Sequence, residues 1–414
     1  MHPKIALVPS VSRRTPNNGP YRDCRHTSVT SGAGGEEGTV SSEVPNFTAR
    51  NRKLLSILRS RLSMALHFGH SELGLKQRAF WQNHRRRHAR GHHARDNWQL
   101  SNLKIGESLG QGSFGTVLRV KTKDSGTIAA VKCIKKSLLE PDRELSRVKN
   151  EFSCWRAMSS HPAVIELYAF LETERHWCFV MEHADLGSLS QIIRSSDLRL
   201  TPANIRRIAA QIGHALSTLH AAGYLHRDIS CSNIMLTSAL DARLIDFGLS
   251  VKGRTGVNRC GSLAYMAPEV LRKCPGVCGS DWWSLGIVIY AMLMGRTPLA
   301  IHAYKKRVDL ASATREVRFA IAKSTPIRIS RRLSPDEKAV LIDILREDPS
   351  TRLGARNNQN FDEVKQHAFF KDIDWTEMDR ARFSILTRLS RKRQWAERSR
   401  RPEYQAGAEH PGAM

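Results

Sequence analysis

The chain has 414 residues, 41% of them hydrophobic, so it exceeds one average domain and can bury a substantial core. Its formal net charge of +26 is unevenly spread, because residues 1–98 contain 17 Lys or Arg and only 6 Asp or Glu. The eight cysteines lack the spacing of a zinc site and no apolar run is long enough to cross a bilayer, which argues against a zinc module and a membrane-spanning protein.

The same features predict the location of the protein and the charge of its partners. Residues 1–10 lack the apolar run of a secretory signal, and the cysteine usage fits a reducing compartment, so we expect a soluble intracellular protein, cytoplasmic or nuclear. The positive charge favours an anionic partner for the N-terminal extension, with solvated, solubilising tails as the plainer interpretation.

Residues 1–97 are predicted to form a basic, largely disordered extension. Residues 1–50 have few large apolar side chains, so burial would not offset the entropy of ordering them. Residues 53–80 show helical periodicity with interspersed arginines, which predicts an amphipathic helix that docks on the domain that follows it, on a membrane surface or on calmodulin, or has no partner. The run at 84–95 is typical of a nuclear-import patch or of a charged linker.

Regular structure is expected over residues 98–375, followed by a basic tail over residues 376–414. Alternation over Gly106–Lys121 and Thr127–Ile134 predicts antiparallel strands, and residues from Pro202 onward have helical periodicity. This order predicts an α+β fold, with a small sheet-rich lobe (98–183) on a larger helical lobe (184–375).

The sequence predicts the first residues of two helices in the larger lobe. Thr201 precedes Pro202 as an N-cap with proline at the first helical position. The Ser-Pro-Asp-Glu segment at 334–337 is a capping box.

A G-x-G-x-x-G-x-V motif occupies residues 110–117 between the first expected strands. Because glycine has no side chain, the backbone N–H groups of such a turn can approach phosphates, although an isolated glycine-rich turn is more often only a hairpin. The residues assigned to nucleotide contacts here are Gly110, Gln111, Gly112, Ser113, Phe114, Gly115 and Val117.

Lys132 follows Ala130 in a strand rich in β-branched residues, where an unpaired charge would be costly. It therefore requires an anionic partner. Glu151, 11 residues before Pro162, is the preferred helix carboxylate and Glu144 is its competitor. An isolated helix glutamate is more often a surface charge, so the assignment depends on the flanking motifs.

Two acidic motifs follow in the larger lobe. His226-Arg227-Asp228-Ile229 with Asn233 places an acid and an amide five positions apart, and Asp246-Phe247-Gly248 comes later. Either aspartate alone would be read as a loop cap. Their order behind the glycine motif and the lysine makes a chance match improbable.

These motifs in this order resemble the eukaryotic protein kinases, over about Trp98 to Trp375. The resemblance implies Mg-ATP as cofactor: Lys132 contacts the α- and β-phosphates and pairs with Glu151, while Asp246 and Asn233 hold Mg2+. It implies that Asp228 orients the acceptor hydroxyl and accepts its proton. It also implies an adenine pocket near Ala130, with Met181 as gatekeeper and backbone hydrogen bonds from Glu182 and Ala184.

The resemblance extends to supporting residues and to a branch of the family. It implies a buried ion pair between Glu269 and Arg352, and Asp281 binding the backbone of the catalytic loop. Residues 260–265, the tryptophans at 282–283 and residues 352–354 and 367–375 resemble the AGC group, which implies Ser/Thr substrates. Within them, Ser262 is expected to hydrogen-bond the catalytic aspartate through its hydroxyl.

The sequence departs from that pattern in its chemistry and substrate contacts. Ser230 stands where Ser/Thr kinases place a lysine that neutralises the γ-phosphate, which predicts slow turnover or compensation by a nearby basic residue. Acidic residues that read basic substrates are replaced by Ser188, Ser232 and Ala291, so neutral or acidic sites are expected.

Regulation is also expected to differ. Asn258 occupies the position of the activating phosphothreonine, which leaves Thr255 as a substitute candidate beside Arg227. The tail lacks the AGC hydrophobic motif. We expect its residues Phe383, Ile385, Leu386 and Leu389 to form a short basic helix docked on the small lobe, or to be disordered.

The sequence thus predicts a protein serine/threonine kinase that transfers the γ-phosphate of ATP to protein substrates. A pseudokinase scaffold that binds nucleotide without efficient transfer is the alternative, supported by Ser230. Nucleic acid is not expected to be the main partner.

Overall fold

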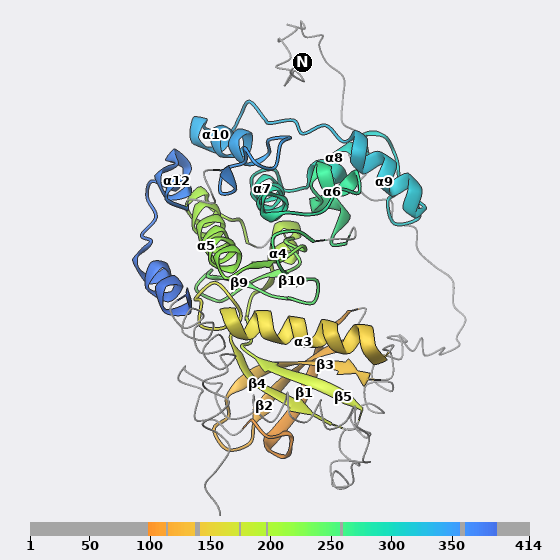
Figure 1. Ribbon diagram of the computed structural model, residues 1–414, viewed down its shortest axis with the longest axis vertical. Coiled ribbons are helices and arrows are strands. Elements are labelled where there is room, and N and C mark those ends of the chain that lie inside the picture. The colour runs from red at the N-terminus through yellow and green to blue at the C-terminus, as the bar shows by residue number, and fades with distance from the viewer. Residues whose placement is uncertain are drawn as a thin grey trace, which may run out of the picture. The chain divides into compact units, whose positions relative to one another are not determined.

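The computed structural model describes residues 98–112, 115–136, 141–173, 175–195, 198–256, 260–356 and 361–386, without the side chains at 112 and 141–147 (Figure 1). The predicted helix at 53–80 and the basic run at 84–95 lie outside the described residues, as do Ser113, Phe114, Asn258 and the end of the tail. The side chain of Glu144 is not described either.

Five antiparallel strands form the sheet of the small lobe, in the order β1-β2-β3-β5-β4. Alternating buried and half-exposed side chains in β2 follow from the pleat of a strand with one face on the core. Lys132 pairs with Val117 on one side and Phe179 on the other, so it lies inside the sheet. The strands are β1 (Leu103–Gly112), β2 (Gly115–Thr122), β3 (Ile128–Lys135), β4 (Leu167–Glu172) and β5 (His176–Met181).

Helix α3 (Pro141–Met158) lies between this sheet and the large lobe (Figure 1). It buries Phe152, Trp155 and Met158 almost completely. Trp155 stacks on Phe179 of β5 with ring centroids 5.6 Å apart, and its indole N–H donates to the Ile165 carbonyl at 2.8 Å. Burial of these large side chains fixes α3 against the sheet, at about 1.5–3 kcal/mol each.

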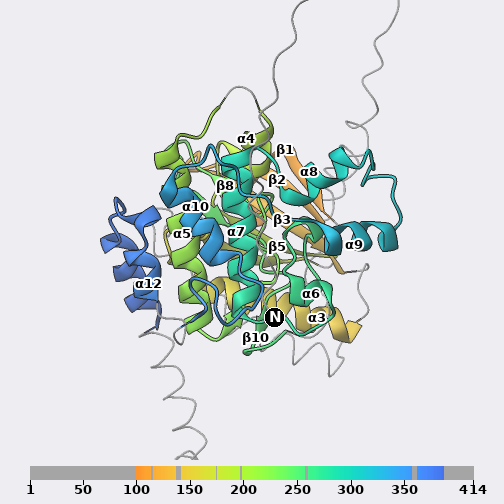
Figure 2. The ribbon, with the colours of Figure 1, turned by 90° about the horizontal axis from the view of Figure 1, so that it is seen from above.

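The large lobe is built around α7 (Cys278–Met294), which lies at its centre in both views (Figures 1 and 2). Nearly all of α7 is buried, and it packs on α5 (Pro202–Ala221) and α10 (Pro335–Ile344). Further helices of this lobe are α4 (Leu189–Arg194), α6 (Pro268–Leu271), α8 (Pro298–Lys305), α9 (Arg315–Ser324) and α12 (Phe361–Gln366), with the 3-10 turns η4 (Leu263–Tyr265) and η5 (Ala368–Phe370). The 3-10 turn η2 (Leu100–Asn102) precedes β1 in the small lobe.

Short strands line the junction of the lobes. The strands β6 (Gly187–Ser188), β8 (Ile234–Leu236) and β9 (Ala242–Leu244) form one sheet, and β7 (Tyr224–Leu225) pairs with β10 (Val251–Lys252). They hold the loops that carry Asp228 and Asp246. The predicted α+β fold with a small sheet-rich lobe and a larger helical lobe is confirmed.

Both predicted helix starts are confirmed. The Thr201 hydroxyl accepts from the Asn204 N–H at 3.2 Å. Ser334 and Glu337 form the reciprocal pair of hydrogen bonds of a capping box, at 3.3 and 2.8 Å.

The docking site expected for the tail is wrong. Residues 376–386 are helical and pack on the large lobe rather than on the small one. Ile385 is fully buried, Asp379 accepts from His214 of α5 at 3.1 Å, and Arg382 donates to Ser217 of α5. The contacts join residues 165 positions apart, which local periodicity does not reveal.

Among the described helices, none is alone long and apolar enough to cross a membrane. One bent pair, α7 with α8 at 61°, passes that test by length and composition.

Candidate active site

Lys132 of β3 is the centre of the polar contacts between the lobes. Its Nζ lies 2.7 Å from Glu151 Oε1 of α3 and 3.0 Å from Asp246 Oδ1 of the large lobe. Burial alone would lower the pKa of Lys132, but the two carboxylates outweigh it and raise the pKa above its usual range. The lysine is therefore held as a cation that joins small lobe, α3 and large lobe.

Asp246 is held in an unusual backbone conformation. Its φ is +62°, in the left-handed region that non-glycine residues rarely adopt. The Gly248 N–H donates to its Oδ1 at 3.3 Å. Burial raises the pKa of this carboxyl, and the attraction of Lys132 overcomes that effect and leaves the pKa lowered, so Asp246 stays ionised.

Asp228 and Asn233 meet in the loop between β7 and β8. The Asn233 amide nitrogen donates to the Asp228 Oδ2 at 2.8 Å and to the Asp228 carbonyl at 2.9 Å. The Ser262 N–H donates to Asp228 Oδ1 at 2.8 Å. The predicted contact of Ser262 therefore exists, but the backbone makes it rather than the hydroxyl.

Asp281, at the start of α7, binds the backbone of the loop that carries Asp228. Its Oδ2 accepts from the His226 N–H and its Oδ1 from the Arg227 N–H, at 2.9 and 2.8 Å, as predicted. His220 Nε2 lies 2.9 Å from the same carboxylate. Burial raises the pKa of Asp281, but these hydrogen bonds and the neighbouring histidines lower it overall. The contacts stabilise Arg227 at a φ of +71°.

Phe247 packs against α3. It is fully buried, with its ring centroid 6.3 Å from Trp155 and 5.2 Å from His226. The role of Trp155 was not predicted, although Glu151 and Trp155 are four positions apart and so lie on one face of the helix. One face of α3 thus supports both the lysine and the phenylalanine.

The predicted nucleotide-binding residues line the strands around Lys132. A side chain at Gly115 would come within 1.9 Å of the Cys133 carbonyl, so only glycine fits there, whereas Gly110 has open space beside it. Ala130 pairs with Met181 at the end of β5, and the Glu182 N–H is already bonded to the Glu166 carbonyl. Ala184 follows as a buried residue. Their contacts with nucleotide stay predictions.

A pocket that is open to solvent lies beside Asp228. The segment from Asp246 to Glu269, which we call the activation segment, contributes Cys260 and Ser262 to its walls, and the start of α7 contributes further lining residues. Next to it, Ser230 is buried, and its hydroxyl has no hydrogen-bond partner among the described residues.

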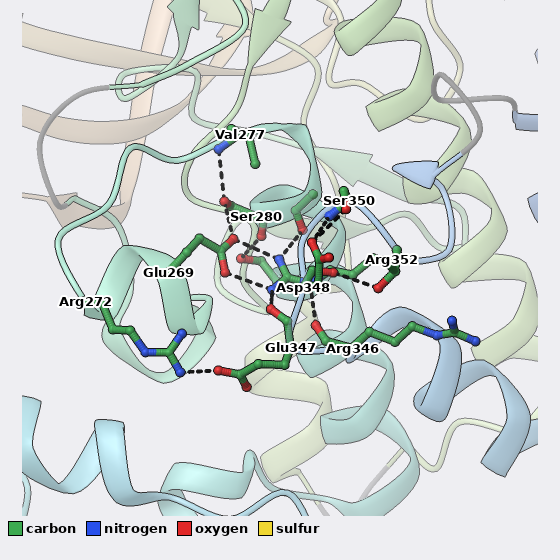
Figure 3. Close-up of polar contacts among 12 residues, drawn as sticks. Glu269, Arg272, Val277, Ser280, Arg346, Glu347, Asp348, Ser350 and Arg352 are labelled. Carbon is green, nitrogen blue, oxygen red and sulfur yellow. Dashed lines mark hydrogen bonds and ion pairs between the residues drawn. The ribbon is translucent and has the colours of Figure 1, made fainter. Parts of the chain in front are cut away.

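The predicted ion pair between Glu269 and Arg352 is confirmed (Figure 3). Two parallel hydrogen bonds of 2.8 Å join the guanidinium and the carboxylate, and Arg352 is fully buried. Arg352 also donates to the carbonyls of Arg346, Glu347 and Gly279, at 2.7 to 2.9 Å. Burial raises the pKa of Glu269, but Arg352 and Ser280 lower it overall. This network anchors the end of the activation segment.

Known proteins match the domain that carries this site. The sequence model of the protein kinase domain matches residues 103–370. The chain is 32% identical to protein kinase C zeta type of Oryctolagus cuniculus over 280 residues, 67% of this chain and 46% of the relative. It is 31% identical to atypical protein kinase C of Drosophila melanogaster over 68% of this chain and 47% of the relative.

A third relative, protein kinase 2 of Dictyostelium discoideum, is 31% identical over 70% of this chain and 57% of its own length. The chain thus spans about half the length of the curated relatives it matches. Relatives of the protein kinase C type support the predicted resemblance to the AGC group. The chain belongs to the eukaryotic protein kinase family.

Proposed function

We propose that this protein is a serine/threonine kinase that transfers the γ-phosphate of Mg-ATP to hydroxyl groups of protein substrates. The observation that carries the proposal is the contact of Lys132 with both Glu151 and Asp246, at 2.7 and 3.0 Å. This pairing aligns α3, the sheet and the metal-binding aspartate at the same time, which phosphoryl transfer in kinases requires.

The residues present fit Mg-ATP. Asp246 is ionised, and its side chain is 44% exposed, so an oxygen remains accessible to a cation. Asn233 uses its amide N–H groups on Asp228, which leaves its carbonyl oxygen as a ligand. Mg2+ takes few protein ligands and completes its shell with phosphate and water, so a carboxylate and an amide are sufficient.

Each polar side chain then has a distinct role. Mg-ATP, when bound, supplies the phosphoryl group and the metal charge that neutralises it. Lys132 provides a fixed cation for the phosphates, and Glu151 orients it. Asp228, held through both carboxylate oxygens by Asn233 and the Ser262 N–H, orients the acceptor hydroxyl and accepts its proton.

The pseudokinase alternative depends on Ser230. Its hydroxyl is buried and unpaired among the described residues, so it supplies no positive charge at this position. The intact set of Lys132, Glu151, Asp228, Asn233 and Asp246 favours catalysis over a scaffold. We therefore propose an active enzyme with slow turnover.

Transfer of label from Mg-ATP to a degenerate Ser/Thr peptide library tests the proposal. The wild-type chain is expected to label peptides, and Asp246→Asn, which keeps the shape of the side chain, is expected to lower the rate at least about a hundredfold. Nucleotide binding without any transfer by the wild type would favour the scaffold instead.

Regulation and location complete the proposal. Thr255 is the candidate phosphorylation site, because the neighbouring Gly256 lies against the Arg227 side chain. Mass spectrometry that finds no phosphate on Thr255 in fully active enzyme would contradict this assignment. The seven described cysteines are free, which supports an intracellular location, cytoplasmic or nuclear. An anionic partner for residues 1–97 is a further proposal.

A further inference from the structure

A second charged feature of the large lobe takes no part in the site above. Residues 296–332, which include α8 and α9, contain ten Lys or Arg and two Asp or Glu, a net charge of +8. Residues 99–375 together carry only +11, so most of the excess positive charge of this part of the chain is concentrated there. We call the exposed cations of residues 296–332 the α8–α9 basic surface; all ten are exposed.

Three cations of this surface, Lys305, Lys306 and Arg318, have no ion-pair partner in the described part of the chain. Asp309, one of the two acids, accepts from the Ala311 N–H at 2.9 Å and caps a turn. A positive potential therefore extends into solvent, where it attracts anionic groups over about a Debye length.

The α8–α9 basic surface adjoins the acceptor site. Both α8 and α9 contact η4, and the views show the two helices side by side at one edge of the large lobe (Figure 2). The turn η4 begins directly after Ser262, whose N–H is 2.8 Å from Asp228 Oδ1. A peptide chain bound along α8 and α9 can therefore continue to the catalytic aspartate.

The exposed side chains favour a protein partner over lipid or nucleic acid. The large apolar side chains exposed on this surface are Tyr304 and Val317, at 75% and 44%. Two such groups are few for insertion into a bilayer, and one aromatic ring is a poor platform for stacked bases. On the acceptor side, Ser188 and Ser232 bring no carboxylate that would repel an acidic chain.

We propose that the α8–α9 basic surface docks an acidic segment of the protein substrate and so delivers its hydroxyl to Asp228. This inference rests on the proposed kinase function and adds the substrate class. It predicts that acidic residues several positions away from the acceptor lower KM, by steering and retaining the substrate, without changing kcat.

The test compares two peptides with the same Ser acceptor, one extended by six Glu and one by six Gln. In the full chain, Lys305→Glu/Lys306→Glu/Arg318→Glu is expected to raise KM for the Glu peptide about tenfold or more at low salt. The KM for the Gln peptide and for ATP should stay unchanged. Lys104→Glu/Lys121→Glu/Lys123→Glu, which reverses three exposed lysines of the small lobe, is the control with the same change of charge.

A binding measurement separates this inference from the kinase proposal. Fluorescence anisotropy of a labelled Glu-rich peptide on an Asp228→Asn background requires no phosphoryl transfer, and the triple reversal should weaken binding by the same factor. Equal effects of the reversal and the control, or an equal rise in KM for the Gln peptide, would overturn docking here. So would an equal loss of affinity for phosphatidylserine vesicles or single-stranded RNA, because the surface would then bind any polyanion.

Discussion

At the level of single residues, the site combines strained backbone with hydrogen-bonded charges. Arg227 and Asp246 have left-handed backbones, which cost about 1–3 kcal/mol each unless neighbouring contacts enforce them. Asp281 enforces the first through two backbone hydrogen bonds, and Lys132 with Gly248 holds the carboxylate of the second. These contacts therefore hold the left-handed backbone that precedes Asp228 and the one at Asp246.

Ser230 is a position where a substitution is expected to raise the catalytic rate. Ser230→Lys is expected to raise kcat by about tenfold or more, because a cation near the transferred phosphoryl group stabilises the transition state. Initial rates at saturating Mg-ATP measure it. Ser230→Ala is the control: it removes a buried hydroxyl without a described partner, so it should leave kcat unchanged and not lower the melting temperature. No gain from the lysine would mean that another cation already supplies this charge.

The buried pair of Glu269 and Arg352 is expected to dominate the stability of the activation segment. Removing one partner, as in Arg352→Leu, leaves a buried carboxylate and should cost about 3–5 kcal/mol in the free energy of unfolding. Denaturant titration measures the loss. Arg272→Leu, which breaks the exposed pair with Glu347, is the comparison and should cost less than about 1 kcal/mol; similar losses for both would contradict the account.

At the scale of elements, the helix at 376–386 connects to the small lobe through a directed relay of hydrogen bonds. The Ala163 N–H donates to His161 Nδ1, so His161 Nε2 carries the proton that it donates to His214 Nδ1 at 2.9 Å. His214 Nε2 in turn donates to Asp379 at 3.1 Å. Both histidines are neutral in this arrangement, and the relay braces the loop that follows α3.

This relay predicts a pH dependence of stability. Burial lowers the pKa of His214 to about 4 and the pKa of His161 well below its usual range. The unfolded chain therefore binds more protons below about pH 6.5, so stability is fully present above that pH and falls as the pH approaches 4. The loss from His214 is on the order of 3 kcal/mol.

Urea titrations between pH 4.5 and 7.5 measure this dependence. His214→Leu is expected to be less stable at pH 7, since it leaves His161 without its acceptor, and to lose less stability on acidification. Wild-type stability that is equal at pH 5 and pH 7 would contradict the relay.

Local sequence patterns are sufficient to predict part of the fold. The strands, the helix starts at Thr201 and Ser334 and the order of the motifs follow from periodicity and capping, which short segments encode. The position of the 376–386 helix on the large lobe could not be predicted from such local patterns. Its partners His214 and Ser217 lie on a distant helix, and only the assembled core brings them near Asp379.

At the scale of the whole molecule, the site exists because separate segments converge on Lys132. The resemblance to protein kinases was sufficient to identify Lys132, Glu151 and Asp246 as site residues. The distances between them depend on how α3 packs between the sheet and the large lobe. The aromatic contact of Trp155 with Phe247 couples that packing to the segment that carries Asp246. Neither the Ser262 backbone contact nor the α8–α9 basic surface follows from motif order, because both depend on neighbours in space.

Calorimetric titration of ATP with and without Mg2+ measures whether the side chains that converge on Lys132 form a Mg-ATP site. The wild-type chain is expected to bind ATP at least about tenfold more tightly with Mg2+, and Asp246→Asn should abolish that difference while it leaves the melting temperature nearly unchanged. Equal affinity in the presence and absence of Mg2+, or an unchanged metal dependence in Asp246→Asn, would contradict the account.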